Sequence, residues 1–188
     1  MKPLQFIFSL AEASHGGLAV RTIAHRGKTM GLIVVNISEM AISNRKSDVL
    51  ITYSLGSCLG VSVYDPQIAL GGLIHCLLPL ASASPDKAKA NPHMFVNTGV
   101  SDMIRTLMRM GASRTRLIIK VAGGGKMMGV NNIFDVGARN FSTAQKLFST
   151  NNLTIAGKEV GGSVPRTLSL FMETGKVTIR SLGAEKEL

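Results

Sequence analysis

The segment Thr52–Pro79 constrains the fold most, because it holds two apolar stretches on either side of a tight turn. Leu59–Tyr64 is apolar and partly β-branched, and Leu70–Leu78 is apolar and ends before a proline. Between them, Asp65-Pro66-Gln67 is turn chemistry, since proline presets φ for the first turn position. The pattern predicts a β-hairpin.

The hairpin brings a thiol and an imidazole together. If Pro66 and Gln67 form a two-residue loop, Cys58 lies directly opposite His75. Opposite residues share a face of the sheet, with Cβ atoms about 4.5–5.5 Å apart, and a thiol and an imidazole can then form a nucleophile–base pair. A one-residue slip would separate them, and a free cysteine can also be a small buried hydrophobe. Both interpretations of Cys58 stay open on spacing alone.

The residues directly before Cys58 suit a nucleophile. Gly56 and Ser57 precede it, so the backbone can turn sharply there. A free backbone N–H at such a turn can help to bind an oxyanion. We therefore expect Gly56 and Ser57 to support the site.

Six sequence blocks stand in a recognisable order. They are Leu55-Gly-Ser-Cys58, Gly71-Gly-Leu-Ile-His75-Cys-Leu-Leu-Pro79, Val121-Ala-Gly-Gly-Gly125, Val136-Gly-Ala-Arg-Asn140, Gly161-Gly-Ser-Val-Pro-Arg166 and Thr174-Gly-Lys-Val177. Over roughly Leu32 to Arg180, the chain resembles the chemoreceptor glutamine deamidase family, CheD. The resemblance implies that Cys58 is the nucleophile, that His75 is its base, and that Thr52 assists.

The resemblance also implies an activity. The protein would convert glutamine side chains of methyl-accepting chemotaxis receptors to glutamate through a cysteine thioester, with release of ammonia, and hydrolysis of methylglutamate esters is the same acyl chemistry. The substrates would be the cytoplasmic helices of the receptors, so a cytoplasmic hydrolase without a cofactor is expected. A CheC-type phosphatase is a further expected partner.

Other functions fit parts of the sequence. The chain could be a chemotaxis interaction protein that binds a CheC-type phosphatase or a receptor, with catalysis secondary. A cysteine peptidase or a transglutaminase is a weaker alternative. No metal site is predicted, because adjacent strand residues such as His75 and Cys76 point to opposite faces and no Cys-x-x-Cys is present. Arg139 and Arg166 could face a substrate or donate structural hydrogen bonds.

The net charge of +10 limits the kinds of partner molecule that the protein is expected to bind. An excess of 21 basic over 11 acidic residues favours an acidic partner, although a solvated basic surface is the alternative. The basic residues are scattered and no nucleic-acid signature is visible, so nucleic acid is not expected. No apolar run reaches the 18 residues that would predict a membrane-spanning helix. An acidic protein surface agrees with the Glu/Gln-rich receptor helices that the resemblance implies.

The remaining pattern predicts a single α+β domain with layered, largely antiparallel β-sheets packed with two main helices. Residues 1–31 precede the family-like blocks, and we expect a poorly ordered extension there; residues 32–182 form the domain, and the polar tail 183–188 frays. The expected helices are His93–Met110, ending at Gly111, and Asp135–Asn151. The other expected strands are Leu32–Ile37, Val49–Tyr53, Leu117–Ala122, Leu153–Val160, Leu168–Glu173 and Lys176–Leu182. Ser38–Met40 is expected to lead into a short irregular connection, and loops are expected at Asn44–Asp48 and Ala81–Pro92.

Overall fold

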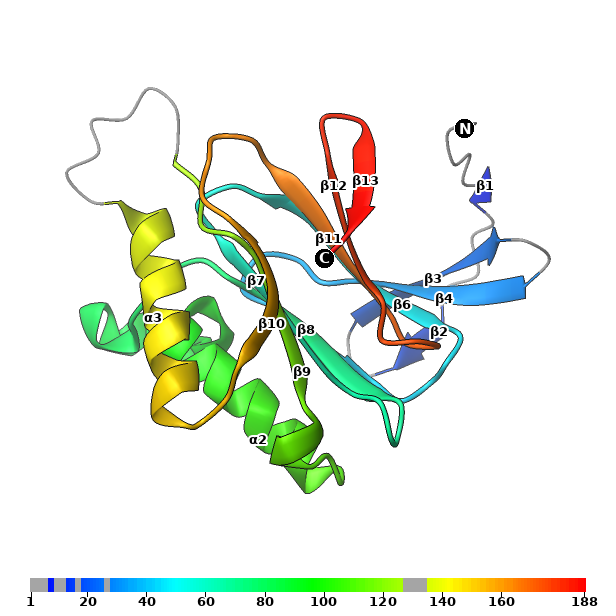
Figure 1. The fold of residues 1–188 in the computed structure, drawn as a ribbon, viewed down its shortest axis with the longest axis horizontal. Helices are drawn as coiled ribbons and strands as arrows, with labels where there is room; N and C mark the ends of the chain where they lie inside the picture. Colours follow the sequence, from blue (N-terminus) through cyan, green and yellow to red (C-terminus); the bar gives the residue numbers. More distant parts are fainter. Residues whose placement is uncertain (1–6, 9–12, 16–17, 26–27, 127–134) are drawn as a thin grey trace.

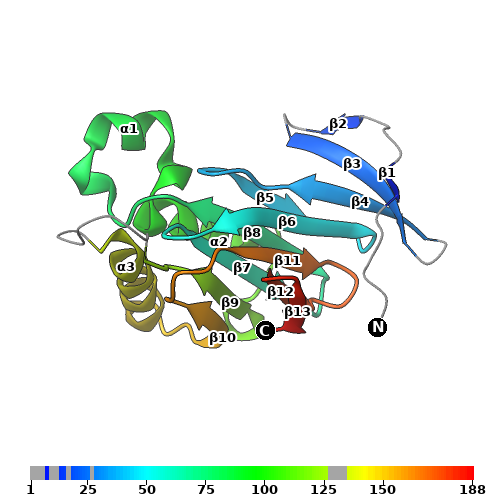
Figure 2. The same ribbon diagram turned by 90° about the horizontal axis from the view of Figure 1, so that it is seen from above.

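The computed structural model describes residues 7–8, 13–15, 18–25, 28–126 and 135–188, with side chains from Met30 onward. Two β-sheets stack face to face, and helices cover the far face of one of them (Figures 1 and 2). The three layers are one sheet, the other sheet and the helices. We call the sheet that lies between the helices and the other sheet the central sheet, and we call the other sheet the outer sheet. The predicted α+β class and the layered, mostly antiparallel architecture are confirmed.

Each sheet is antiparallel apart from one parallel pair. In the outer sheet the strands Lys28–Val34 and Asp48–Leu55 run parallel, and in the central sheet Ile118–Gly123 and Ile155–Val160 do. The outer sheet consists of β1 (Ile7–Phe8), β2 (Ala13–His15), β3 (Leu18–His25), β4 (Lys28–Val34), β6 (Asp48–Leu55), β11 (Arg166–Phe171), β12 (Val177–Ser181) and β13 (Ala184–Glu187). The central sheet has the order β10 (Ile155–Val160), β9 (Ile118–Gly123), β7 (Leu59–Asp65), β8 (Leu70–Cys76) and β5 (Met40–Ser43).

The helices lie on the face of the central sheet that points away from the outer sheet (Figure 2). The two main ones are α2 (Ser101–Arg109) and α3 (Val136–Thr150). Shorter elements are α1 (Pro85–Ala90), the π-helix Val96–Val100 and the 3-10 turns Ala81–Ala83, Pro92–Met94 and Arg114–Arg116. No helix in the described part of the chain is long and apolar enough to cross a bilayer.

The three layers enclose two apolar cores, because the side chains of the central sheet alternate between its faces. The core on the helix side contains Val61, Ile74, Cys76, Met103 and Phe148, among others. The inter-sheet core contains Leu50, Leu55, Cys58, Leu73 and Leu168, among others. Strands β7 and β8 are buried along their whole length, so the hairpin forms the centre of the fold.

The hairpin is confirmed, but its predicted register is wrong. The loop comprises the four residues Pro66–Ala69, and His75 pairs with Gly60 rather than with Cys58. The carboxylate of Asp65 accepts a hydrogen bond from Gln67 N, which shapes a longer turn than the one assumed. Because the shift is two residues and the side-chain period is also two, Cys58 and His75 remain on the same face.

Of the two predicted helices, the second is confirmed in full. Asp135 caps α3 by accepting a hydrogen bond from Ala138 N at 2.9 Å. The predicted helix from His93 is interrupted, because Phe95 is extended and the next turn is the π-helix Val96–Val100. The N–H groups of Val96 and Asn97 bond to carbonyls of the preceding loop instead of to the helix. Gly111 follows α2 with φ of +102°, as a C-cap glycine should.

Three further differences concern short segments. The region predicted as irregular before Asn44 contains β5, and the loop after the His75 strand contains α1. The polar tail does not fray, because β13 pairs with β12 through its backbone. In residues 1–31, β3 pairs with β4, and the rest of the extension lies largely outside the described residues. A domain boundary at residue 32 therefore stays a prediction.

Candidate active site

A hydrogen bond across the two sheets joins Thr52 and His75. Thr52 lies on β6 and His75 on β8, and 2.7 Å separate Thr52 Oγ1 from His75 Nδ1. The sequence predicted this contact. Both residues are buried, at 0% and 1% exposed. His75 Nε2 is also buried and has no hydrogen-bond partner among the described atoms. If Nδ1 carries the ring hydrogen and donates a hydrogen bond to Thr52 Oγ1, Nε2 has a free lone pair and can accept a proton.

Cys58 faces the same core as the imidazole. It ends the bend Gly56–Cys58 between β6 and β7, it is 8% exposed, and it packs in the inter-sheet core. Because Gly60 is opposite His75, Cys58 is the diagonal neighbour of His75. Cys76 lies on the other face of β8, in the helix-side core. Of the two thiols, Cys58 is therefore the one that shares a face with His75.

Burial sets the charge states of the thiol and the imidazole. It lowers the pKa of His75 from 6.5 to about 4. Burial also raises the pKa of the Cys58 thiol above its ordinary 9.0, with a smaller opposing effect from the residue's own backbone N–H. At neutral pH the pair is therefore a neutral thiol beside a neutral imidazole. In this state the imidazole is a base ready to act, and no ion pair has formed in advance.

The bend that carries Cys58 is held by a glycine-rich turn. Gly124 N donates to Cys58 O and Gly125 N donates to Gly56 O, both at 2.8 Å. Gly123 has φ of +102°, and a Cβ there would overlap the carbonyl oxygen of Cys58, so this position requires glycine. Among the described residues, the N–H groups of the bend itself donate no backbone hydrogen bond. That these N–H groups bind an oxyanion stays a prediction.

Sequence reasoning missed Asn140. Its Nδ2 donates to Ser57 O at 2.9 Å and to Leu77 O at 3.1 Å, and the residue is fully buried. The buried face of α3 runs through Gly137, Asn140, Ala144 and Phe148. An amide in the middle of that otherwise small or apolar face was the signal that could have identified it.

The two candidate arginines differ in their surroundings. Arg166 is 7% exposed, and its guanidinium donates to Gly161 O at 2.7 Å and to Val164 O at 3.2 Å. Gly161 N in turn donates to Gly123 O, so Arg166 braces the glycine-rich turn. This placement favours the structural interpretation of Arg166. Arg139 is exposed on α3 beside Asn140, and it remains a candidate to face a substrate.

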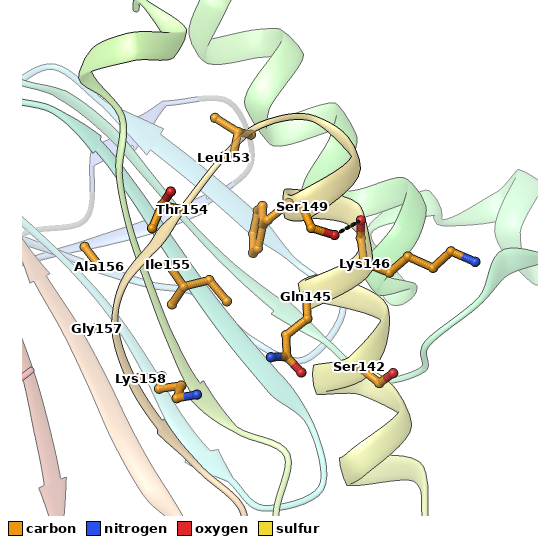
Figure 3. Close-up of a pocket in the computed structure, with 11 residues that line it drawn as sticks. Ser142, Gln145, Lys146, Ser149, Leu153, Thr154, Ile155, Ala156, Gly157 and Lys158 are labelled. Atoms are coloured by element: carbon orange, nitrogen blue, oxygen red, sulfur yellow. Dashed lines mark hydrogen bonds between the residues drawn. The ribbon is translucent and has the colours of Figure 1, made fainter.

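The described His, Cys, Asp and Glu side chains include no group of three that could hold a metal ion. A groove does lie elsewhere on the surface, between α3 and β10 (Figure 3). Gln145 and Lys146 line it from the helix, and Thr154 and Lys158 from the chain that leads into and through the strand. Neither Cys58 nor His75 borders this groove, so it is separate from the candidate active site.

Comparison of the sequence with known proteins matches the chain to one family. Residues 77–181 match the family model CheD, described as CheD chemotactic sensory transduction. The probable chemoreceptor glutamine deamidase CheD 1 of Syntrophus aciditrophicus (strain SB) is 42% identical over 154 residues, which are 82% of this chain and 96% of the relative. The probable chemoreceptor glutamine deamidase CheD of Solibacter usitatus (strain Ellin6076) is 37% identical over 85% of this chain and 94% of its own length. The resemblance predicted from the sequence blocks is thus confirmed, and the chain belongs to the CheD family.

Proposed function

We propose that this protein deamidates glutamine side chains of chemoreceptors, producing glutamate and ammonia. The observation that carries the proposal is the buried hydrogen bond between Thr52 and His75, which leaves His75 Nε2 free on the face that Cys58 shares. The names of the relatives supply the substrate class, since they are called probable chemoreceptor glutamine deamidases.

The chemistry would begin with a proton transfer from Cys58 to His75 Nε2. The thiolate then attacks the carbonyl carbon of the glutamine side chain, and the N–H groups of Gly56, Ser57 and Cys58 stabilise the oxyanion. Collapse of this intermediate breaks the C–N bond, and protonated His75 gives its proton to the leaving ammonia. The product of this half-reaction is a thioester on Cys58.

The second half-reaction consumes one water molecule. His75 Nε2, neutral again, removes a proton from the water, which attacks the thioester carbonyl. The C–S bond breaks, the thiol is restored, and the side chain leaves as glutamate. Methylglutamate esters would follow the same path with methanol as the leaving group. In both half-reactions Thr52 Oγ1 accepts a hydrogen bond from Nδ1–H of His75, and this bond stabilises the imidazolium.

The substrate surface would be acidic, because the protein carries a net charge of +10. Arg139 is exposed one residue from Asn140, which contacts the bend of Cys58, so it would meet a substrate helix near the reacting glutamine. A CheC-type phosphatase partner and a cytoplasmic location stay predictions of the family resemblance.

Mass spectrometry of a chemoreceptor co-expressed with the protein tests this function. Each deamidation adds about one mass unit, since OH replaces NH2. We expect specific receptor glutamines to become glutamate with the wild type and with Cys76→Ser, because Cys76 lies in the other core. Cys58→Ala should leave the receptor unchanged. Equal deamidation with Cys58→Ala and with the wild type would contradict the proposal.

A further inference from the structure

We propose that Asn140 is a positioning residue that holds the nucleophile and the base of this site in register. The inference rests on the proposed function for its catalytic consequence, and its geometry stands independently. One buried amide nitrogen bonds to the chain on both sides of the candidate pair, at Ser57 O and at Leu77 O.

Cys58 needs such a support because the sheet does not hold it. The ladder between β7 and β8 begins at Leu59, which pairs with Cys76, so Cys58 lies outside the paired strand. His75 is inside the ladder, and β8 ends one residue later. The Asn140 amide uses one hydrogen for the carbonyl just before Cys58 and the other for a carbonyl two residues after His75. It thereby links the bend that carries Cys58 to the strand that carries His75.

Close packing of helix α3 fixes the position of Asn140. One turn earlier, Gly137 packs so closely against Gly124 and Gly125 that a Cβ on it would overlap their backbone atoms. One turn later, Ala144 is fully buried in the helix-side core. The glycine-rich turn beneath the helix is the same turn that bonds to Cys58 O and Gly56 O. The same backbone segment, Gly124–Gly125, therefore contacts both the helix that carries Asn140 and the bend that carries Cys58.

The identity of the residue also points to function. Asn140 Oδ1 is buried and has no hydrogen-bond partner among the described residues. Burying an acceptor without a partner destabilises a fold, so a packing role alone would favour an apolar side chain here. What an apolar side chain lacks is the pair of N–H donors. The two bonds to the chain around Cys58 and His75 account for the amide.

The test measures how well His75 assists Cys58 without using a receptor. In a Cys76→Ser background, Cys58 is the one thiol, and its alkylation by iodoacetamide is followed from pH 5 to pH 10. We expect Asn140→Ala to lower the rate at pH 7 to that of His75→Ala, and the double variant to show no further loss. At high pH, where the thiolate forms without assistance, the rates should converge. Asn140→Leu keeps about the shape of the side chain, loses both donors, and should match Asn140→Ala.

Deamidation kinetics supply the second readout. With Asn140→Ala, kcat should fall roughly ten- to a thousandfold, the scale of positioning effects, while KM changes little. The exposed Gln145→Ala on the same helix is the matched control and should leave both constants unchanged. Circular dichroism first establishes that each variant is folded at the assay temperature, and Asn140→Leu, which leaves no cavity, serves if Asn140→Ala is not.

Two results would overturn the inference. If alkylation at pH 7 is as fast as in the parent or faster, Asn140 only packs the fold, whatever happens to activity. If the effects of Asn140→Ala and His75→Ala simply add, the two residues act separately. Should the protein fail to deamidate any receptor while the alkylation coupling is present, the proposed function would fail and the positioning role of Asn140 would stand.

Discussion

Replacing Thr52 by valine isolates one hydroxyl group of the site. Valine keeps the β-branched shape on β6 but removes Oγ1, which lies 2.7 Å from His75 Nδ1. Both residues are almost fully buried, so water cannot replace the lost partner. The imidazole then loses the acceptor that fixes which nitrogen faces the thiol. The imidazolium formed during the reaction loses the same support.

The magnitude follows from the strength of that bond. A hydrogen bond to a charged group contributes about 1.5–3 kcal/mol, and each 1.36 kcal/mol in the barrier is about tenfold in rate. The hydroxyl supports the imidazolium in the transition state more than the neutral ring in the ground state. We therefore expect Thr52→Val to lower kcat roughly ten- to two-hundredfold. Stability should fall by about 1–3 kcal/mol, because the shape of the buried side chain is kept but the buried Nδ1–H is left without a partner.

The assay is ammonia release from a purified receptor fragment, with thermal unfolding followed in parallel. Thr52→Ser is the matched control, since it restores the hydroxyl, and it should retain much of the rate. If Thr52→Val releases ammonia at the wild-type rate, the hydroxyl plays no part in the reaction. The site would then reduce to Cys58 and His75, with Thr52 as scaffold.

Four other predictions concern charge and topology. Because His75 acts as a neutral base and burial lowers its pKa to about 4, kcat/KM should fall on the acid side near that pH rather than near 6.5. Between about pH 6.5 and pH 4 the unfolded chain binds a proton at His75 and the folded chain does not. The free energy of unfolding should therefore fall by up to about 1.4 kcal/mol for each pH unit by which the pH is lowered in this range. Denaturant titrations should show this slope, and His75→Gln should remove it. Arg116 and two backbone N–H groups hold the pKa of Asp65 below its usual range, so Asp65 stabilises the fold above about pH 4 and this contribution is lost as pH falls further; Asp65→Asn should therefore unfold more easily at pH 7 and differ less from the wild type in acid. A chain that begins at Met30 should keep full activity, because Thr52, Cys58 and His75 all lie in the part that remains; loss of ammonia release from a folded truncated chain would refute this.

The centre of the fold was accessible to sequence reasoning because its signal is local. Two apolar stretches around a proline turn specify a hairpin, and the period of two in a strand protected the relation of Cys58 to His75 from an error of two residues. The loop length itself could not be predicted, since it depends on how the Asp65 side chain folds over the turn. Likewise, the tail forms β13 through backbone pairing with β12, to which exposed ion pairs of Lys186 and Glu187 are added. The side chains of β13 are exposed and have no alternating apolar pattern that could have predicted a strand.

The face of α3 could have identified Asn140 as unusual, but its two partners could not be predicted, for a different reason. Its two carbonyl partners lie 83 and 63 positions away in the chain, and no periodic pattern connects an amide on a helix with a bend between strands. The same holds for Arg166, whose acceptors are local but whose role depends on Gly161 N bonding to the distant Gly123. Residues that support a site from a second element are visible only once the layers are assembled.

Ammonia release by purified protein tests the central claim most directly. The wild type, Cys58→Ala and Cys76→Ser are incubated with a purified chemoreceptor fragment, and ammonia is counted against the glutamates formed. We predict one ammonia per new glutamate for the wild type and for Cys76→Ser. Cys58→Ala should release none while it keeps its circular dichroism spectrum. Wild-type ammonia release by folded Cys58→Ala would contradict the assignment of Cys58 as the nucleophile.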